Sequence, residues 1–150
     1  MVLNKDFKEF IKLLNAHNVR YLVVGGYAVA LHGYPRYTKD LDIWILVDPA
    51  NAINMANALR DFGFTGLNPS DFLIPDEFVQ LGYPPNRIDI ITSCEGLDFE
   101  TAYARKEKVG VDDLEVHFLD LDSLLVNKRA VGRPQDKADV SNLQKKRPKK

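Results

Sequence analysis

Residues 21–47 read YLVVGGYAVALHGYPRYTKDLDIWILV, and here a glycine pair and a pair of acids lie between two apolar runs. Gly25 and Gly26 end the first run, which predicts a strand that turns directly into a helix. Asp40 and Asp42 open the second run, and a spacing of two places both carboxylates on the same face of a strand. Because like charges on one face repel each other, the segment predicts a sheet that gathers acids for a bound cation.

The chemistry of these four residues indicates which cation and which ligand. Mg²⁺ takes hard oxygen ligands, so a divalent ion would offset the repulsion between Asp40 and Asp42. Gly25 and Gly26 offer free backbone N–H groups at a helix N-terminus, where phosphate binds. A phosphate site beside a metal site in one short segment indicates phosphoryl or nucleotidyl transfer.

Asp89 is the natural third acid, because it is a lone carboxylate inside the apolar strand expected over residues 87–92. An unpaired charge buried there is costly, and a metal ion would remove that cost. If this strand lies beside the one that begins at Leu41, the three acids converge at one end of the sheet. They would then hold two Mg²⁺ ions, or Mn²⁺, roughly 3.5–4 Å apart, and Asp89 could also accept the proton of an acceptor hydroxyl.

The apolar periodicity predicts a chain of both helices and strands that ends in two helices. The strand over residues 41–47 is apolar on both faces and is therefore expected at the centre of the sheet. Helices are expected over residues 6–17, 27–32, 50–62, 99–104, 121–131 and 135–145, and strands over 21–24, 41–47, 72–74, 78–81, 87–92, 106–111 and 114–118. In the helix over residues 50–62, Ile53, Ala56 and Leu59 are expected to face inward.

Length and charge narrow the classes of function. The 150 residues are expected to form one domain over 1–144, followed by a basic, disordered tail over 145–150 that is either simply solvated or a loose anchor on RNA. A net charge of −1 excludes a molecule that is basic throughout and binds nucleic acid. The absence of a long apolar run, the lack of a signal-like N-terminus and the single Cys94 predict a cytoplasmic protein without a membrane partner.

The glycine pair, the Asp40-Leu41-Asp42 motif and the distant Asp89 together resemble the DNA polymerase beta-type nucleotidyltransferases. The segments GGYAVALHGYPRYTKDLD, LGYPPNRIDIITS and LLVNKRAVGRPQDKADVSNL extend the resemblance over most of residues 20–143. They are similar to small prokaryotic nucleotidyltransferases and to the AbiEii-type toxins of abortive-infection and toxin–antitoxin systems. The resemblance implies an α+β nucleotidyltransferase fold, with a central mixed β-sheet flanked by helices. It also implies transfer of a nucleoside monophosphate from an NTP to a hydroxyl of RNA (including tRNA), a protein or a small molecule, and a cognate antitoxin or toxin as partner.

Further residues are candidates for contact with the nucleotide. Arg36 and Thr38 stand just ahead of the acid pair, and Arg36 would clamp the triphosphate or neutralise the acids when no metal is bound. The resemblance implies that Lys128 reaches a nucleotide phosphate. The alternative for this region is an ion-pair latch between the two C-terminal helices, in which Arg133 binds Asp136 or Asp139.

One departure from the resemblance leaves a second function open. Many active members have Gly-Ser where this chain has Gly26 followed by Tyr27. The alternative is therefore a non-catalytic nucleotide-binding or toxin–antitoxin interaction module on the same fold. A metal-dependent phosphohydrolase is the third hypothesis, and it is disfavoured because no histidine pattern accompanies the acids.

Overall fold

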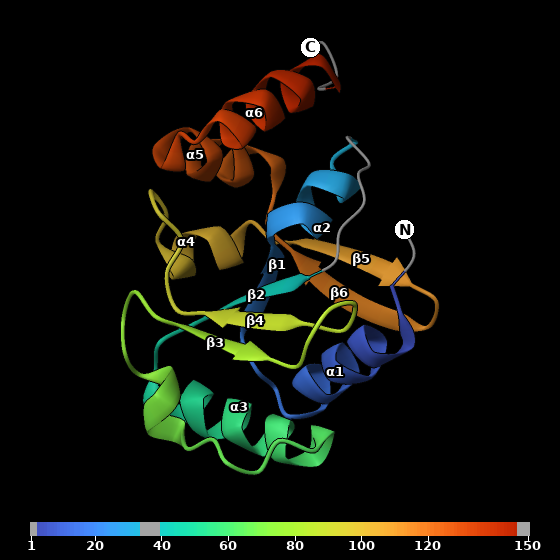
Figure 1. Cartoon of the computed structure of the whole chain (residues 1–150), viewed down its shortest axis with the longest axis vertical. Helices are drawn as coiled ribbons and strands as arrows, with labels where there is room; N and C mark the ends of the chain where they lie inside the picture. Colours follow the sequence, from blue (N-terminus) through green and yellow to red (C-terminus); the bar gives the residue numbers. More distant parts are fainter. Residues whose placement is uncertain (1–2, 34–39, 147–150) are drawn as a thin grey trace.

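The structure, a computed structural model, describes residues 3–33 and 40–146. A central sheet separates two layers of helices, which Figure 1 shows above and below the strands. Arg36 and Thr38 lie outside the described residues, as do residues 147–150 of the basic tail. Within the described part of the chain, no helix has the length and apolar character needed to cross a membrane.

The sheet of the described residues is mixed, with the strand order β3-β4-β2-β1-β6-β5. Its strands are β1 (Tyr21–Val24), β2 (Leu41–Ile45), β3 (Phe78–Leu81), β4 (Ile88–Ile91), β5 (Glu107–Val111) and β6 (Leu114–Phe118). The pairs β2/β4 and β1/β6 are parallel, and the other neighbours are antiparallel. The strand β2 lies inside the sheet between β4 and β1, as its two-sided apolar pattern predicts.

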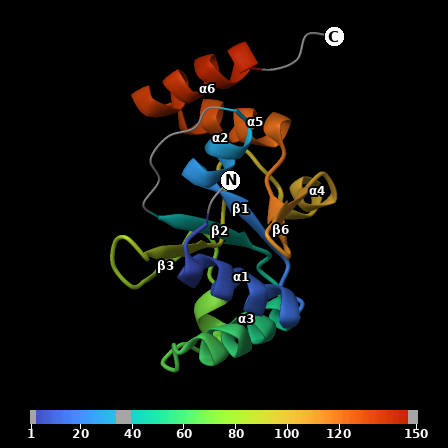
Figure 2. The same ribbon diagram turned by 90° about the vertical axis from the view of Figure 1, so that its right-hand side faces the viewer.

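Helices cover both faces of this sheet. They are α1 (Lys5–Ala16), α2 (Gly25–Leu31), α3 (Pro49–Phe62), α4 (Phe99–Ala104), α5 (Leu121–Val131) and α6 (Pro134–Lys146), together with the short 3-10 helix η1 (Pro69–Phe72). Figure 2 shows α1 and α3 below the sheet and α5 and α6 above it. The predicted α+β architecture, with its mixed sheet and its two C-terminal helices, is confirmed.

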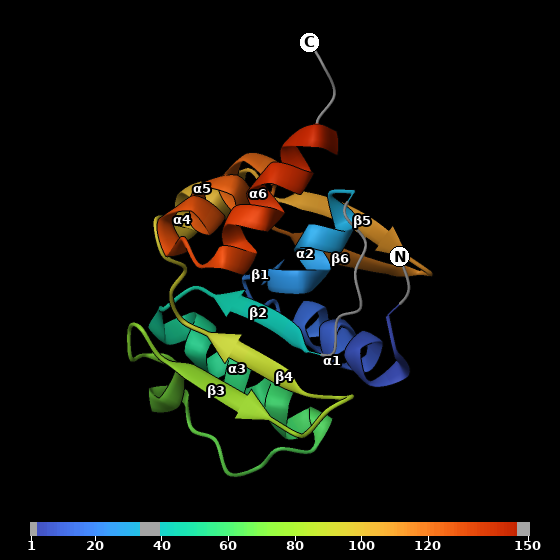
Figure 3. The ribbon, with the colours of Figure 1, turned by 45° about the horizontal axis from the view of Figure 1, so that its top comes forward.

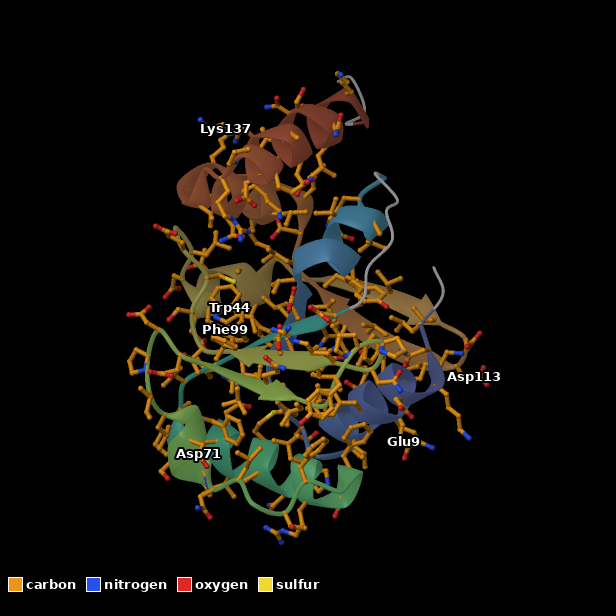
Figure 4. All side chains as sticks on the ribbon, in the orientation of Figure 1. Glu9, Trp44, Asp71, Phe99, Asp113 and Lys137 are labelled. Carbon is orange, nitrogen blue, oxygen red and sulfur yellow. The ribbon has the colours of Figure 1, made fainter. Side chains whose placement is uncertain are left out.

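The alternation of side chains along β2 supplies both halves of the core. Leu41, Ile43 and Ile45 are fully buried, and the side chains between them point to the opposite face. On that opposite face Trp44 meets Phe99 of α4 edge to face, with ring centroids 5.0 Å apart. Figure 4 shows these two labelled side chains close together between α4 and the sheet. The face that carries Trp44 is therefore the face that α4 covers.

Three local predictions were wrong, each for a physical reason. Residues 72–74 do not form a strand, because Asn68 and Asp71 cap each other around Pro69 and wind the chain into η1. The helix α2 begins at Gly25 rather than at Tyr27, so the glycines form its first turn. Ile53 of α3 is 51% exposed, since the buried stripe of that helix runs through its neighbours Ala52, Met55, Ala56 and Leu59.

The two C-terminal helices are joined by a buried ion network. Lys128 of α5 lies 3.2 Å from a carboxylate oxygen of Asp136 and 3.1 Å from one of Asp139, and both acids belong to α6. Arg133, between the helices, binds Asp136 at 2.7 Å. Because Lys128, Asp136 and Asp139 are almost completely buried, their ion pairs offset part of the cost of removing these charges from water. The predicted ion pair between Arg133 and Asp136 is present. Lys128 is the buried cation of the network and binds both Asp136 and Asp139.

Replacement of Lys128 by Met is expected to lower the free energy of unfolding by about 3 kcal/mol or more, because it removes the buried ammonium group that binds both Asp136 and Asp139. Urea unfolding of the purified chain measures this change. The control is Lys137→Met on the neighbouring helix α6, where replacement of an exposed lysine is expected to change stability by no more than about 0.5 kcal/mol. Equal midpoints for the two variants would contradict the latch.

Candidate active site

The register of two parallel strands brings the acids together. Asp42 of β2 lies directly opposite Asp89 of β4, and aligned residues of parallel neighbours point to the same face. Asp40 precedes β2 by one residue, so alternation places it on that face as well. The shared face is the one that Trp44 occupies further along β2, beneath α4. The predicted adjacency of the two acid-bearing strands is thus confirmed, and Figure 3 shows them side by side.

Electrostatics indicate how tightly the acids are grouped. Burial, together with the negative charges of Asp89 and Asp40, raises the pKa of Asp42 from 3.8 to about 7. The positive charges of Arg87 and Lys128 act in the opposite direction. The grouping of the three carboxylates therefore opposes ionisation of Asp42. Near neutral pH this carboxyl group is partly protonated.

Asp40 has an oxygen that is available to a cation. Its Oδ1 atom is buried and lacks a hydrogen-bond partner among the described residues. A buried carboxylate oxygen without a donor is costly, and a bound cation would satisfy it. The other oxygen, Oδ2, lies 3.8 Å from Nε of Arg87.

Gly25 brings the backbone of α2 against Asp42. Its φ of +65° lies in the left-handed region, and a Cβ atom built there would lie 2.1 Å from Oδ2 of Asp42. A side chain is therefore excluded by both conformation and space. The residue before it, Val24, is the N-cap of α2 and makes no side-chain hydrogen bond to the first turn of the helix. Gly26 is buried in the same turn.

Arg87 is a site residue that the sequence analysis did not single out. Its Nε and Nη2 atoms donate to the two oxygens of Asp89 at 3.0 and 3.1 Å. The signal was present, because an arginine two residues before an acid on a strand shares its face.

The remaining candidates are placed as follows. Lys128 is buried in the network with Asp136 and Asp139, yet its charge still lowers the pKa of Asp42, so it lies within electrostatic reach of the acids. Cys94 is buried with its pKa raised to about 12 by burial, which keeps it a neutral thiol. His32 contacts the backbone oxygen of Leu119 at 2.8 Å, a structural role.

Comparison with known proteins assigns the family. The sequence profile described as "Nucleotidyltransferase of unknown function (DUF6036)" matches residues 3–145. The chain belongs to this nucleotidyltransferase family. A comparison with curated proteins found no match.

Solved structures of nucleotidyltransferases share its fold at low sequence identity. A candidate nucleotidyltransferase from Thermotoga maritima is 16% identical, with a TM-score of 0.60 over 94% of this chain and 91% of that one. The lincosamide antibiotic adenylyltransferase LnuA, solved with lincomycin, is 15% identical, with a TM-score of 0.58 over 97% and 99%. A nucleotidyltransferase-like antigen of Paracoccidioides brasiliensis is 18% identical, with a TM-score of 0.55 over 96% and 77%. The resemblance to polymerase beta-type nucleotidyltransferases is confirmed for the fold.

The donor set of this nucleotidyltransferase suits a divalent ion, although the acids are not closed around one point. Within residues 3–33 and 40–146, no three acid, histidine or cysteine side chains stand ready to enclose a metal. Three carboxylates on one face and a buried oxygen of Asp40 without a donor among the described residues nevertheless favour binding of a hard cation. Asp89 is the exception, since Arg87 occupies both of its oxygens.

Replacement of Gly25 by Ala is expected to lower the free energy of unfolding by at least about 2 kcal/mol, because a positive φ and a clash with Asp42 act together. Urea unfolding measures the loss. Gly110→Ala is the control, since a Cβ there meets nothing within 4 Å and the change is expected to stay within about 1 kcal/mol. Similar losses for both variants would contradict the close approach of Gly25 to Asp42.

The raised pKa of Asp42 predicts a particular pH dependence of stability without metal. The folded chain binds this proton more tightly than the unfolded chain, so stability falls as pH rises from about 4 to 7, by at most about 1.4 kcal/mol per pH unit. Asp42→Asn removes the group and should flatten that decline in unfolding free energies measured across the range. Asp113→Asn, on an exposed turn, should keep the wild-type slope. Identical slopes of unfolding free energy against pH in wild type and both variants would refute the raised pKa of Asp42.

Proposed function

We propose that this chain transfers a nucleoside monophosphate from an NTP to a hydroxyl acceptor in a Mg²⁺-dependent reaction. The observation that carries the proposal is the register that pairs Asp42 with Asp89 on one face, with Asp40 just ahead and Gly25 against Asp42. Family membership supports the reaction class. The acids occupy a face that also borders the start of α2, where an incoming phosphate would find backbone N–H groups.

In this proposal Asp40, Asp42 and Asp89 hold two Mg²⁺ ions, with Mn²⁺ as a substitute. When bound, these ions would neutralise the triphosphate and stabilise the entering and leaving oxygens. The unpartnered oxygen of Asp40 and the proton held by Asp42 near neutral pH are the features of this chain that support the assignment. Metal binding would release that proton and leave Asp42 fully ionised.

The chain's own groups would then orient the reactants. The N–H groups of Gly25 and Gly26 would bind phosphate oxygens, because the missing side chain lets the backbone approach closely. Arg36 and Thr38, four and two residues ahead of Asp40, are proposed to contact the triphosphate. Lys128 would attract the nucleotide phosphates through the positive electrostatic potential of its charge rather than by direct contact, since its ammonium group already binds Asp136 and Asp139.

The transfer step balances as a displacement at the α-phosphorus. A bond forms between the acceptor oxygen and this phosphorus, the bond to the oxygen that bridges to the β-phosphate breaks, and pyrophosphate leaves. The proton of the acceptor hydroxyl would pass to a carboxylate oxygen of Asp89. Arg87 would have to release that oxygen first, because both oxygens of Asp89 accept its hydrogen bonds.

The acceptor is proposed only by class, as a hydroxyl of RNA (including tRNA), a protein or a small molecule. The fold neighbour LnuA is described as an antibiotic adenylyltransferase, which supports the small-molecule class by analogy of fold alone. A toxin–antitoxin setting with a cognate partner and a cytoplasmic location stay predictions from the sequence.

One observation favours a second candidate, a non-catalytic nucleotide-binding or toxin–antitoxin interaction module. Arg87 occupies the acid that would receive the acceptor proton, and Tyr27 stands where many active members have serine. Such a module would bind NTP without forming product. Turnover measurements therefore separate the two candidates.

Asp40→Asn, Asp42→Asn and Asp89→Asn are each expected to lower nucleotidyl transfer by at least about 100-fold, because each removes a charge from the metal and proton site. The assay incubates the chain with Mg²⁺ and each labelled NTP, together with total cellular RNA, protein or a panel of small hydroxyl compounds. Label joined to an acceptor, with release of pyrophosphate, measures the reaction.

The control is Asp113→Asn, an acid of the exposed β5–β6 turn that is expected to keep wild-type activity. Calorimetry with Mg²⁺ and a non-hydrolysable NTP completes the design. Binding without any labelled product would favour the non-catalytic module. Absence of NTP binding by the wild-type chain would overturn both candidates.

A further inference from the structure

Arg87 bridges two of the three acids of the site. Its guanidinium donates to both oxygens of Asp89, at 3.0 and 3.1 Å, and lies 3.8 Å from Oδ2 of Asp40. This two-point geometry is the strong form of an arginine–carboxylate pair, because the planar fork matches the carboxylate. The carboxylate of Asp89 in turn raises the pKa of Arg87, so the cation is permanent.

The backbone of the sheet positions this arginine. Arg87 stands two residues before Asp89, so both side chains lie on the same face of the strand. Its carbonyl oxygen accepts a hydrogen bond of 3.0 Å from the N–H of Leu41, which ties it to the start of β2. The guanidinium is therefore carried by the same paired strands that carry the acids.

Arg87 and a divalent ion would require the same ligand. While both oxygens of Asp89 accept hydrogen bonds from Arg87, they already bind the guanidinium cation. The positive charge of Arg87 would repel a second cation close to these oxygens. The Arg87 side chain keeps 29% of its surface exposed, so it is not enclosed within the core. Lys128 cannot take its place, because Asp136 and Asp139 hold it.

We propose that Arg87 is the resident cation of the metal-free acid cluster and that a divalent ion binds by displacing it from Asp89. This inference rests on the proposed metal-dependent function. It makes metal loading an exchange of one cation for another rather than the filling of a preformed site. It also explains why the three acids do not already enclose a common point within the described residues.

The test measures Mn²⁺ binding to the full chain without nucleotide, by the electron paramagnetic resonance signal of free Mn²⁺. Arg87→Gln is expected to bind Mn²⁺ on the order of threefold to tenfold more tightly than wild type, because the competing ion pair is gone. Arg87→Lys keeps the charge but loses the fork, and an intermediate affinity is expected.

The chain offers a matched control in Arg105. Its guanidinium also bridges two acids, at 3.4 Å from Asp120 and 3.0 Å from Asp122, but it lies at the junction of α4 and α5, away from the acid cluster. Arg105→Gln should leave the Mn²⁺ affinity at the wild-type value. Thermal unfolding is the second readout: added Mn²⁺ should raise the melting temperature of Arg87→Gln more than that of wild type.

The outcomes separate this inference from the proposed function. If wild type binds Mn²⁺ and Arg87→Gln binds it equally or more weakly, the exchange is overturned while the metal-dependent function stands. If neither protein binds Mn²⁺, alone or with a non-hydrolysable NTP, the metal-dependent function fails and the exchange fails with it. Tighter binding by Arg105→Gln would also overturn the exchange, because the effect would then reflect net charge alone.

Discussion

The parallel pairing of β2 with β4 holds together charges that would otherwise separate. The register that pairs β2 with β4 also places Asp42 opposite Asp89. The backbone hydrogen bonds of the sheet therefore oppose the repulsion between these two carboxylates. The apolar residues on the opposite face, packed under α1 and α3, make a shift of register costly because it would expose them. The stability of the core is therefore what confines the acids.

Much of the fold was predictable because its elements repeat simple periods. The helices expected over residues 6–17 and 50–62 correspond to α1, with its buried stripe of Phe7, Phe10, Ile11 and Leu14, and to α3, which ends at Gly63 in the left-handed conformation. Prediction failed where a local cap outweighed an apolar run, at residues 69–72, and where one helical step of 100° decided burial, at Ile53. Short runs carry too few periods to settle such competition.

The site was predictable only in part. Asp40, Asp42 and Asp89 were grouped correctly on one face, since a spacing of two and an isolated acid in an apolar strand are strong local signals. The state of Arg87 and of Lys128 was not, because ion pairing depends on which acids the tertiary structure brings within reach. Arg36 and Thr38 lie outside the described residues, so their roles rest on sequence.

The contact between Gly25 and Asp42 couples two positions that are distant in the chain. The left-handed backbone favours glycine at position 25 in any case, but the steric limit comes from the carboxylate of Asp42. In a relative with a smaller residue at position 42, this clash would be absent. Position 25 would then tolerate residues other than glycine more readily. Paired changes at positions 25 and 42 would therefore help to identify, in surveys of genomes, relatives in which the proposed acid site is no longer maintained.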